Sequence, residues 1–145
     1  MNIVLRSATQ ADYPAIADLL QTVHLPIEGV KEHLEHFFVA TLNGKLVGCI
    51  AVEVYESEGL LRSAAVLPEY QHQGIGKQLY DTLLSFCKKR YIERLTLLTT
   101  TAEKYFAQLG FQKIDRGHVA PAVQTSVEFT SACPASAVCM QFVVK

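Results

Sequence analysis

Several residue types are scarce in this 145-residue sequence: it has no tryptophan, only two methionines, and charged residues make up only 19% of it. The sequence has 13 Lys and Arg residues and 14 Asp and Glu residues, so the formal net charge is −1. The composition therefore supplies no broad basic surface for nucleic acid. No apolar run approaches the roughly 20 residues of a membrane-spanning helix, and the first residues lack the basic-then-apolar order of a signal peptide. We therefore expect a cytoplasmic protein that binds neither nucleic acid nor membrane.

Metal-binding patterns and linkers are absent as well. The four cysteines, Cys49, Cys87, Cys133 and Cys139, form no C-x-x-C pair of the kind found in zinc sites. Half of the residues are hydrophobic, so a chain of this length can build a core without disulfides. No internal repeat and no Pro/Gly/Ser-rich stretch divides the sequence. We expect free thiols, no metal, and one domain over residues 1–145.

The order of apolar patterns predicts an α/β (or α+β) fold. Strands are expected at 3–7, 37–42, 45–55, 60–66, 94–100 and 138–144, with a break at 57–59. Helices are expected after the Thr9–Asp12 capping box, over 30–37, from 75 to 90, and from a Thr100–Glu103 capping box to Gly110. Asn43-Gly44 predicts a tight hairpin turn, and the alternation of strand and helix predicts a mixed sheet with a crossover.

Two glycines stand at the start of the helix expected from residue 75. Gly74 and Gly76 occupy positions where glycine costs about 0.5 to 1 kcal/mol relative to alanine. A helix N-terminus presents unpaired N–H groups and binds anions, and glycine lets a phosphate approach the backbone. The sequence has no G-x-x-x-x-G-K-[ST] motif, and Leu79 stands where a dinucleotide fingerprint requires glycine or alanine. QHQGIG is therefore a candidate pyrophosphate cradle of another kind.

Two motifs resemble those of a known family. AVLPEYQHQGIG resembles the acetyl-coenzyme A signature of the GCN5-related N-acetyltransferases (the GNAT family), and AEKYFAQLGF, about 25 residues later, is similar to that family's helix ending in Leu-Gly-Phe. The resemblance covers residues 1 to about 114. It implies the GNAT fold, which is a mixed, mostly antiparallel twisted sheet with helices on both faces and a splayed central strand pair.

The resemblance also implies acetyl-CoA (coenzyme A) as cofactor and a set of residues that hold it. The backbone of Ala64, Ala65 and Val66 would pair with the pantetheine arm as an added strand does. Phe106 stands where many members carry a tyrosine that protonates the departing thiolate, and the neighbouring Tyr105 is rotated by about 100° along the helix. The pyrophosphate would bind the amides of Gln71, His72, Gln73, Gly74, Ile75, Gly76 and Lys77.

Two charged residues are candidates for the chemistry itself. Glu53, near the end of an apolar strand, is a candidate general base acting through water, or else a solvated strand-end carboxylate. Arg62 lies inside LLRSAAV, where an unpaired cation would be costly to bury. It should therefore meet either a protein carboxylate such as Glu53 or an anionic group of the substrate.

A closer resemblance extends over LLRSAAV, LTLLTTTAEKYFAQLGF and the tail TSVEFTSACPASAVCM. These segments look like the small acetyltransferases associated with arsenic resistance and like the acetyltransferase domain of N-acetylglutamate synthases. The similarity implies an amino-acid-like acceptor and an arginine for its carboxylate. Cys133 and Cys139 are either ordinary free cysteines or soft ligands for arsenic(III).

Together these observations predict an N-acetyltransferase that acetylates the amine of a small acceptor. The alternatives are a CoA-binding module without catalysis, suggested by Phe106, and an arsenic-responsive binding protein. The apolar final strand AVCMQFVV could also pair with its copy in a homodimer.

Overall fold

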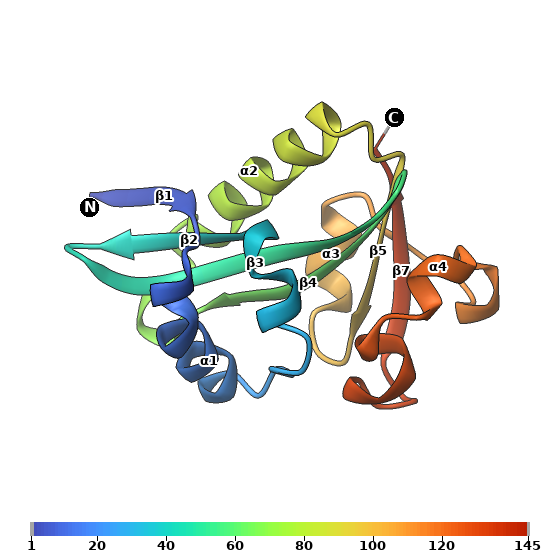
Figure 1. The fold of residues 1–145 in the computed structure, drawn as a ribbon, viewed down its shortest axis with the longest axis horizontal. Helices are drawn as coiled ribbons and strands as arrows, with labels where there is room; N and C mark the ends of the chain where they lie inside the picture. The colour runs from blue at the N-terminus through green and yellow to red at the C-terminus, as the bar shows by residue number, and fades with distance from the viewer. Residues whose placement is uncertain (1, 145) are drawn as a thin grey trace.

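The computed structural model describes residues 2–144. It contains a seven-stranded sheet in the order β1-β2-β3-β4-β5-β7-β6, in which β4 and β5 are parallel and the other neighbours are antiparallel (Figure 1). The strands are β1 (Ile3–Ser7), β2 (Phe37–Leu42), β3 (Lys45–Tyr55), β4 (Glu58–Val66), β5 (Arg94–Thr99), β6 (Gln112–Lys113) and β7 (Val138–Val143). The α-helices are α1 (Tyr13–Thr22), α2 (Ile75–Lys89), α3 (Glu103–Gln108) and α4 (Pro121–Gln124).

Helices cover both faces of the sheet, as the resemblance implied. On one face, Ile16, Leu19 and Leu20 of α1 pack with odd-numbered residues of β3, Cys49 and Ala51. On the other face, the apolar side of α2 packs with the even-numbered Ile50 and Val52 of the same strand. Its buried residues there include Ile75, Leu79, Leu83 and Cys87. Figure 1 shows α1 and α2 on opposite sides of the sheet. Because side chains alternate along a strand, one apolar strand serves both cores.

The predicted hairpin between β2 and β3 is confirmed. Asn43 and Gly44 have φ angles of 51° and 81°, which is the left-handed backbone of a two-residue hairpin turn. The Thr9–Asp12 contact is also present, with the Thr9 N–H donating to Asp12 Oδ2 at 2.7 Å. It opens a short 3₁₀ turn, Gln10–Asp12, that leads into α1.

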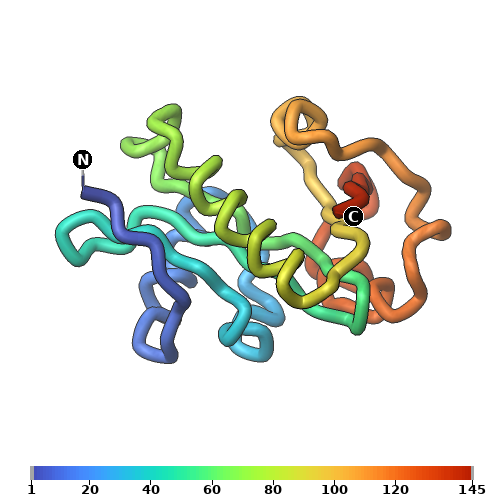
Figure 2. Tube along the Cα trace, turned by 90° about the horizontal axis from the view of Figure 1, so that it is seen from above, coloured from blue at the N-terminus to red at the C-terminus, as the bar shows by residue number. Residues whose placement is uncertain are grey.

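Strands β4 and β5 separate after a short contact. They pair only at Glu58↔Arg94, Gly59↔Leu95 and Leu60↔Thr96, so the second half of β4 has no partner on that side. On its other side β4 keeps pairing with β3, through an irregularity between Cys49 and Ala51 at which Ser63 takes a φ of 59°. Figure 2 shows the β1–β4 part with α2 on one side and the β5, α3 and C-terminal part on the other. The splayed central pair is thus present.

Strand β4 begins earlier than expected. The break predicted at 57–59 is a two-residue turn at Glu56 and Ser57, and Glu58 is already in the strand. Glu58 is only 6% exposed and accepts a hydrogen bond from Arg94 Nε at 3.2 Å. Gly59 fits the strand because a Cβ there would lie 2.9 Å from Val52 Cγ2. Close packing, rather than a turn, explains this glycine.

Other local expectations also differ from the structure. The Thr100–Glu103 capping box is wrong, because Ala102 is the N-cap of α3 and its N–H donates to the hydroxyl of Thr99 at 2.9 Å. The helix expected over 30–37 is a kinked 3₁₀ segment, Lys31–His36. The C-terminal helix α4 and a π turn at Glu128–Ala132 had no periodic signal in the sequence.

The final strand, β7, is paired fully on one side and at two residues on the other. Strand β7 pairs with β5 over all six residues and with β6 at Met140 and Gln141. The homodimer expected through this strand stays a prediction. No helix among the described residues is both long and apolar enough to cross a membrane.

Candidate functional site

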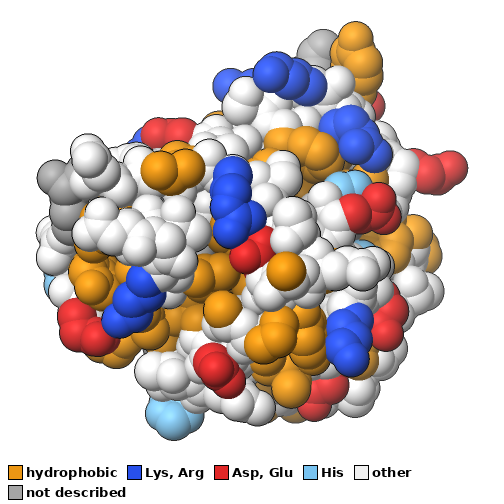
Figure 3. Space-filling view, turned by 60° about the vertical axis from the view of Figure 1, so that its left-hand side comes forward, with side chains coloured by type: hydrophobic (Ala, Val, Ile, Leu, Met, Phe, Trp, Pro, Cys, Tyr) orange, Lys and Arg blue, Asp and Glu red, His pale blue; other side chains and the backbone are white. Residues whose placement is uncertain are grey.

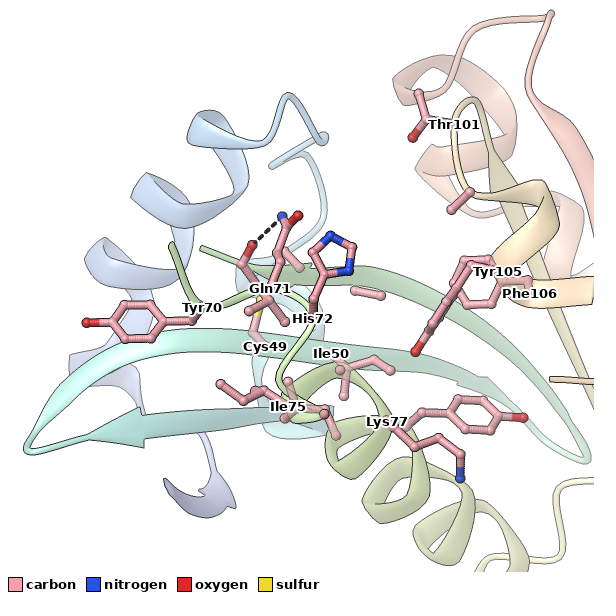
Figure 4. A pocket seen from close by; sticks show the side chains of 18 residues that line it. Cys49, Ile50, Tyr70, Gln71, His72, Ile75, Lys77, Thr101, Tyr105 and Phe106 are labelled. Atoms are coloured by element: carbon pink, nitrogen blue, oxygen red, sulfur yellow. Dashed lines mark hydrogen bonds between the residues drawn. The ribbon is translucent and has the colours of Figure 1, made fainter. Parts of the chain in front are cut away.

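A cavity of about 480 Å³ lies where β4 leaves β5, between the N-terminus of α2 and α3 (Figure 4). It is lined by Cys49, Ile50, Ala64, Ala65, Val66, Tyr70, Gln71, His72, Gly74, Ile75, Gly76, Lys77, Leu79, Tyr80, Thr101, Ala102, Tyr105 and Phe106. All but one of the expected cofactor residues are in this set. The exception is Gln73, whose side chain turns back to the carbonyl oxygen of Glu69 at 3.5 Å.

The loop before α2 presents its backbone to this cavity. His72 and Gly74 have φ angles of 65° and 85°, so the chain turns sharply twice before Ile75 begins the helix. Of the seven amides expected to bind the pyrophosphate, that of Gln71 instead donates to the carbonyl of Pro68 at 3.4 Å. The six backbone N–H groups from His72 to Lys77 donate to no acceptor within residues 2–144. Gln71 fixes the loop to the sheet, because its Nε2 donates to the carbonyl of Val66 at 3.0 Å. Free amides at a helix N-terminus form an anion site.

Gly76 has no structural reason within the chain to be glycine. Its φ is not left-handed, and a Cβ there would meet only Tyr105 Oη at 3.5 Å and Val66 Cγ2 at 3.9 Å, which are ordinary contacts. Glycine nevertheless weakens a helix by about 1 kcal/mol relative to alanine. The space beside this residue is therefore available to a ligand, as the sequence suggested.

Tyr105 and Phe106 both face the cavity from α3. Phe106 is 7% exposed, and its ring packs edge-on against Phe111 at a centroid distance of 5.6 Å. Tyr105 projects toward the N-terminus of α2 (Figure 4), so its hydroxyl lies near Gly76. Burial raises the pKa of Tyr105, which keeps the hydroxyl protonated and able to donate. This position of Tyr105 was not predicted from the sequence, because helical rotation bears only on whether its hydroxyl could replace a tyrosine at 106.

A second cavity of about 590 Å³ adjoins the first. It shares Ala64, Ala65, Val66, Gln71, Thr101, Ala102 and Phe106 with it and extends toward Arg62, Ser63, Glu28, Glu128 and Cys133. The same stretch of β4 therefore lies between two spaces. One contains the free amides, and the other contains charged side chains.

Arg62 and Glu53 form a buried ion pair. Arg62 Nη1 lies 2.9 Å from Glu53 Oε2, and both side chains are 0% exposed. Glu53 also accepts a 2.5 Å hydrogen bond from the hydroxyl of Tyr55, and His33 Nε2 lies 3.7 Å from its other oxygen. Burial alone would raise the pKa of Glu53, but its hydrogen bonds, from Tyr55 first, hold it below the usual value. Of the two partners foreseen for Arg62, the structure shows the protein carboxylate, and the solvated strand-end interpretation of Glu53 is wrong.

Glu128 is a functional candidate that the sequence did not reveal. It is 4% exposed, lines the second cavity and lies 3.5 Å from Arg62 Nη2 through Oε2. Burial raises its pKa, and the lowering effect of Arg62 is opposed by Glu53. Its segment, EFTSA, forms a π turn with no sequence pattern that would predict a site. Only the fold brings it to Arg62.

The four cysteines are free thiols in the structure. Cys133 lines the second cavity, whereas Cys139 is 5% exposed within β7. Burial raises the pKa of Cys133 to about 12 and that of Cys139 to about 11, which disfavours the thiolate form that binds soft ions. Within residues 2–144, no three His, Cys, Asp or Glu side chains are grouped as metal ligands.

Comparison with protein families gives a match over residues 33–113 to the acetyltransferase (GNAT) domain. The chain belongs to the GNAT acetyltransferase family. This GNAT domain is 28% identical over 120 residues to an uncharacterised N-acetyltransferase, CT2212, of Chlorobaculum tepidum, with 77% of each chain covered. It is 29% identical over 119 residues to an amino-acid acetyltransferase of Neisseria meningitidis, covering 76% of this chain but 27% of the relative. The match therefore spans only about a quarter of that longer enzyme.

Solved structures resemble the whole GNAT domain. Rv2747 of Mycobacterium tuberculosis, in complex with CoA and NLQ, superposes with a TM-score of 0.81 at 29% identity, covering 97% of this chain and 98% of that one. N-acetylglutamate synthase of Neisseria gonorrhoeae, complexed with coenzyme A and N-acetyl-glutamate, gives a TM-score of 0.85 at 22% identity over all of this chain and 36% of that one. At that identity the second likeness shows the fold alone.

Proposed function

We propose that this GNAT domain transfers the acetyl group of acetyl-CoA to the amine of a small, amino-acid-like acceptor. The observation that carries the proposal is the run of free backbone N–H groups from His72 to Lys77 beside the splayed half of β4. The names of the relatives support it, since they include an N-acetyltransferase and an amino-acid acetyltransferase. Two similar structures contain coenzyme A.

The residues of the first cavity fit the cofactor. The free amides at the start of α2, with the helix dipole behind them, suit a pyrophosphate, and the absence of a side chain at Gly76 leaves room for its oxygens. The unpaired edge of β4 at Ala64–Val66 suits the amide groups of a pantetheine arm, which can bind there as an added strand does. When bound, acetyl-CoA supplies the acetyl thioester.

Acyl transfer forms one bond to the acceptor nitrogen and breaks one C–S bond. The nitrogen must lose a proton, and the sulfur leaves as a thiolate that later takes up a proton. Phe106, which lines both cavities, has no hydroxyl to supply that proton. A thiol with a pKa of about 8.5 is a tolerable leaving group without such an acid. The missing tyrosine therefore affects how fast the sulfur leaves rather than whether it can leave.

The second cavity is the proposed acceptor site. Arg62 lines it, in line with the proposed contact to an acceptor carboxylate, while Glu53 lines neither cavity. Glu53 can receive a proton from the acceptor only through water or another side chain, such as the Tyr55 hydroxyl bound to it. Its buried pair with Arg62 supports a positioning role for Glu53 besides the proposed role as base.

The test is steady-state release of free thiol from acetyl-CoA in the presence of a panel of amines and amino acids. Acceptor-dependent release with formation of the N-acetyl product is expected. The alternative, favoured by Phe106, is a CoA-binding module, and it predicts coenzyme A binding without any acceptor-dependent release.

Two further predictions from the sequence, a cytoplasmic location and an arsenic-binding role, are also proposals. Cytoplasmic location is compatible with a small-molecule enzyme of this family and can be checked by cell fractionation. The arsenic role of Cys133 and Cys139 predicts that Cys133→Ser and Cys139→Ser weaken arsenite binding. Equal binding by both variants and the unchanged protein would remove that role.

A further inference from the structure

The acceptor cavity is lined by two glutamates, one arginine and His24. Among the described residues that line it, Arg62 is the only lysine or arginine, whereas Glu28 and Glu128 supply two carboxylates. Glu53, which does not line the cavity, adds a third carboxylate behind Arg62. Carboxylates of the protein therefore already balance the positive charge of Arg62.

The hydrogen bonds of Arg62 show how little of it remains free. Nε donates to Ser63 Oγ at 3.0 Å and Nη1 to Glu53 at 2.9 Å. Nη2 has only long contacts, 3.4 Å to the carbonyl of Pro26 and 3.5 Å to Glu128. Because Nη2 is the weakly engaged end, it is the part of the guanidinium that can bind one acceptor carboxylate.

Glu128 is the less firmly held of the two carboxylates on Arg62. Its 3.5 Å contact is longer than the 2.9 Å contact of Glu53, and it lies on the cavity wall rather than behind the arginine. Cys133 also lines this cavity, and burial, together with the neighbouring Glu128 carboxylate, raises the pKa of its thiol. An acceptor ammonium placed in this cavity would meet Glu128, and an additional carboxylate would meet it as well.

We propose that Glu128 makes this cavity selective for amine acceptors with at most one carboxylate, so neutral or cationic amino acids and simple amines are preferred over dicarboxylic amino acids. This inference rests on the proposed function. A single carboxylate can take the Nη2 side of Arg62, displacing the long contact to Glu128. A second carboxylate would find no other Lys or Arg among the described lining residues and would face Glu28 and Glu128 at short range, where like charges repel.

L-Glutamine and L-glutamate provide the test, because they have nearly the same shape and differ by one charge. The unchanged protein should acetylate glutamine with a kcat/KM at least tenfold higher than glutamate. In Glu128→Gln this preference should fall at least fivefold, mainly through a lower KM for glutamate. Glu28→Gln, at the exposed rim, should shift the preference in the same direction by a smaller factor. Glu56→Gln, which removes the same charge from an exposed turn, should leave the ratio unchanged.

Coenzyme A affinity is measured first by calorimetry on the same samples, which also shows that each variant is folded. If the unchanged protein does not bind coenzyme A, the proposed function is contradicted. Intact affinity without thiol release for any amine of the panel would also contradict the proposed function. Where other amines are acetylated, failure to acetylate either glutamine or glutamate would overturn the present inference alone. A preference for glutamate, equal use of both acceptors, or a glutamine preference that Glu128→Gln and Glu28→Gln leave unaltered would do the same.

Discussion

Arg62 Nη1 lies 2.9 Å from Glu53 Oε2, and neither side chain is exposed to solvent. The pair joins the middle of β4 to the end of β3, directly behind the proposed acceptor cavity. Removing one partner of such a pair leaves the other charge buried without compensation. The ion pair therefore holds Arg62 in a fixed position beside the proposed acceptor cavity, whether or not the pair makes a net contribution to the stability of the protein.

Breaking the pair should be costly. Arg62→Met and Glu53→Gln should each lower the free energy of unfolding by about 3 to 5 kcal/mol, and the combined change should cost much less than the sum. Urea denaturation of all four proteins gives the coupling energy. As a control, Asp81→Asn breaks the Lys77–Asp81 pair, in which both side chains are 57% exposed, and should cost less than about 1 kcal/mol. Additive effects of the two buried substitutions would contradict the assignment.

The stability of the protein should also depend on pH through Glu128. Burial raises the pKa of this carboxyl above its ordinary value, and a group of this kind contributes stability below its unfolded-state pKa that is lost as the pH rises through the folded pKa. Glu128→Gln should therefore match the unchanged protein near pH 4 and be more stable than it at pH 8. Urea denaturation at both pH values measures the difference, and a gain that is larger at pH 4 would reverse the assigned direction.

Gly29 is expected to be intolerant of any side chain. Its φ is +84°, and a Cβ there would lie 2.8 Å from Arg62 Nη1 and 2.9 Å from Val127 Cγ1. Gly29→Ala combines a strained backbone with a collision against the buried pair, so it should destabilise the protein by about 2 kcal/mol or more. Gly117→Ala, where a Cβ would meet nothing within 4 Å, is the matched control. Thermal unfolding that ranks the two variants equally would refute this explanation.

Tyr105 should contribute to cofactor binding. Its hydroxyl lies beside Gly76 in the proposed pyrophosphate cradle, where a neutral donor can bind a phosphate oxygen. Tyr105→Phe should weaken coenzyme A binding about three- to tenfold while leaving stability nearly unchanged, since this residue is 44% exposed. Tyr91→Phe, at 84% exposure, should bind normally. Equal affinities in a calorimetric titration would show that the hydroxyl does not reach the cofactor.

Local signals in the sequence predicted much of the fold. The Asn43-Gly44 turn, the apolar run of β3 and the glycines at the start of α2 depend on a few adjacent residues, and the structure has each in the expected place. The separation of β4 from β5 had no such local signal and came only from the family resemblance. A pairing of three residues depends on the packing of distant segments, which a single sequence does not display.

The candidate site was predictable in its backbone part and less so in its side chains. A charged residue inside an apolar strand identified Arg62, and the cost of burying it led to Glu53 as a partner. Glu128 is 66 positions away from Arg62 in the sequence and lies in an irregular turn, so no periodicity connected them. The role of Tyr105 depends on the position of the short helix α3 relative to α2. The rotation of residues along one helix does not predict that position.

The most direct test of the account is a calorimetric titration of coenzyme A into the unchanged protein and Gly76→Asp. An aspartate in the first turn of α2 fits sterically and is favourable to the helix dipole, so the fold should be at least as stable, but its charge would repel a pyrophosphate at the free amides. We predict saturable binding to the unchanged protein, normal binding to Gly117→Asp, and affinity lowered at least tenfold in Gly76→Asp. No binding to the unchanged protein, or equal affinity in Gly76→Asp, would contradict the proposal that these amides hold the cofactor.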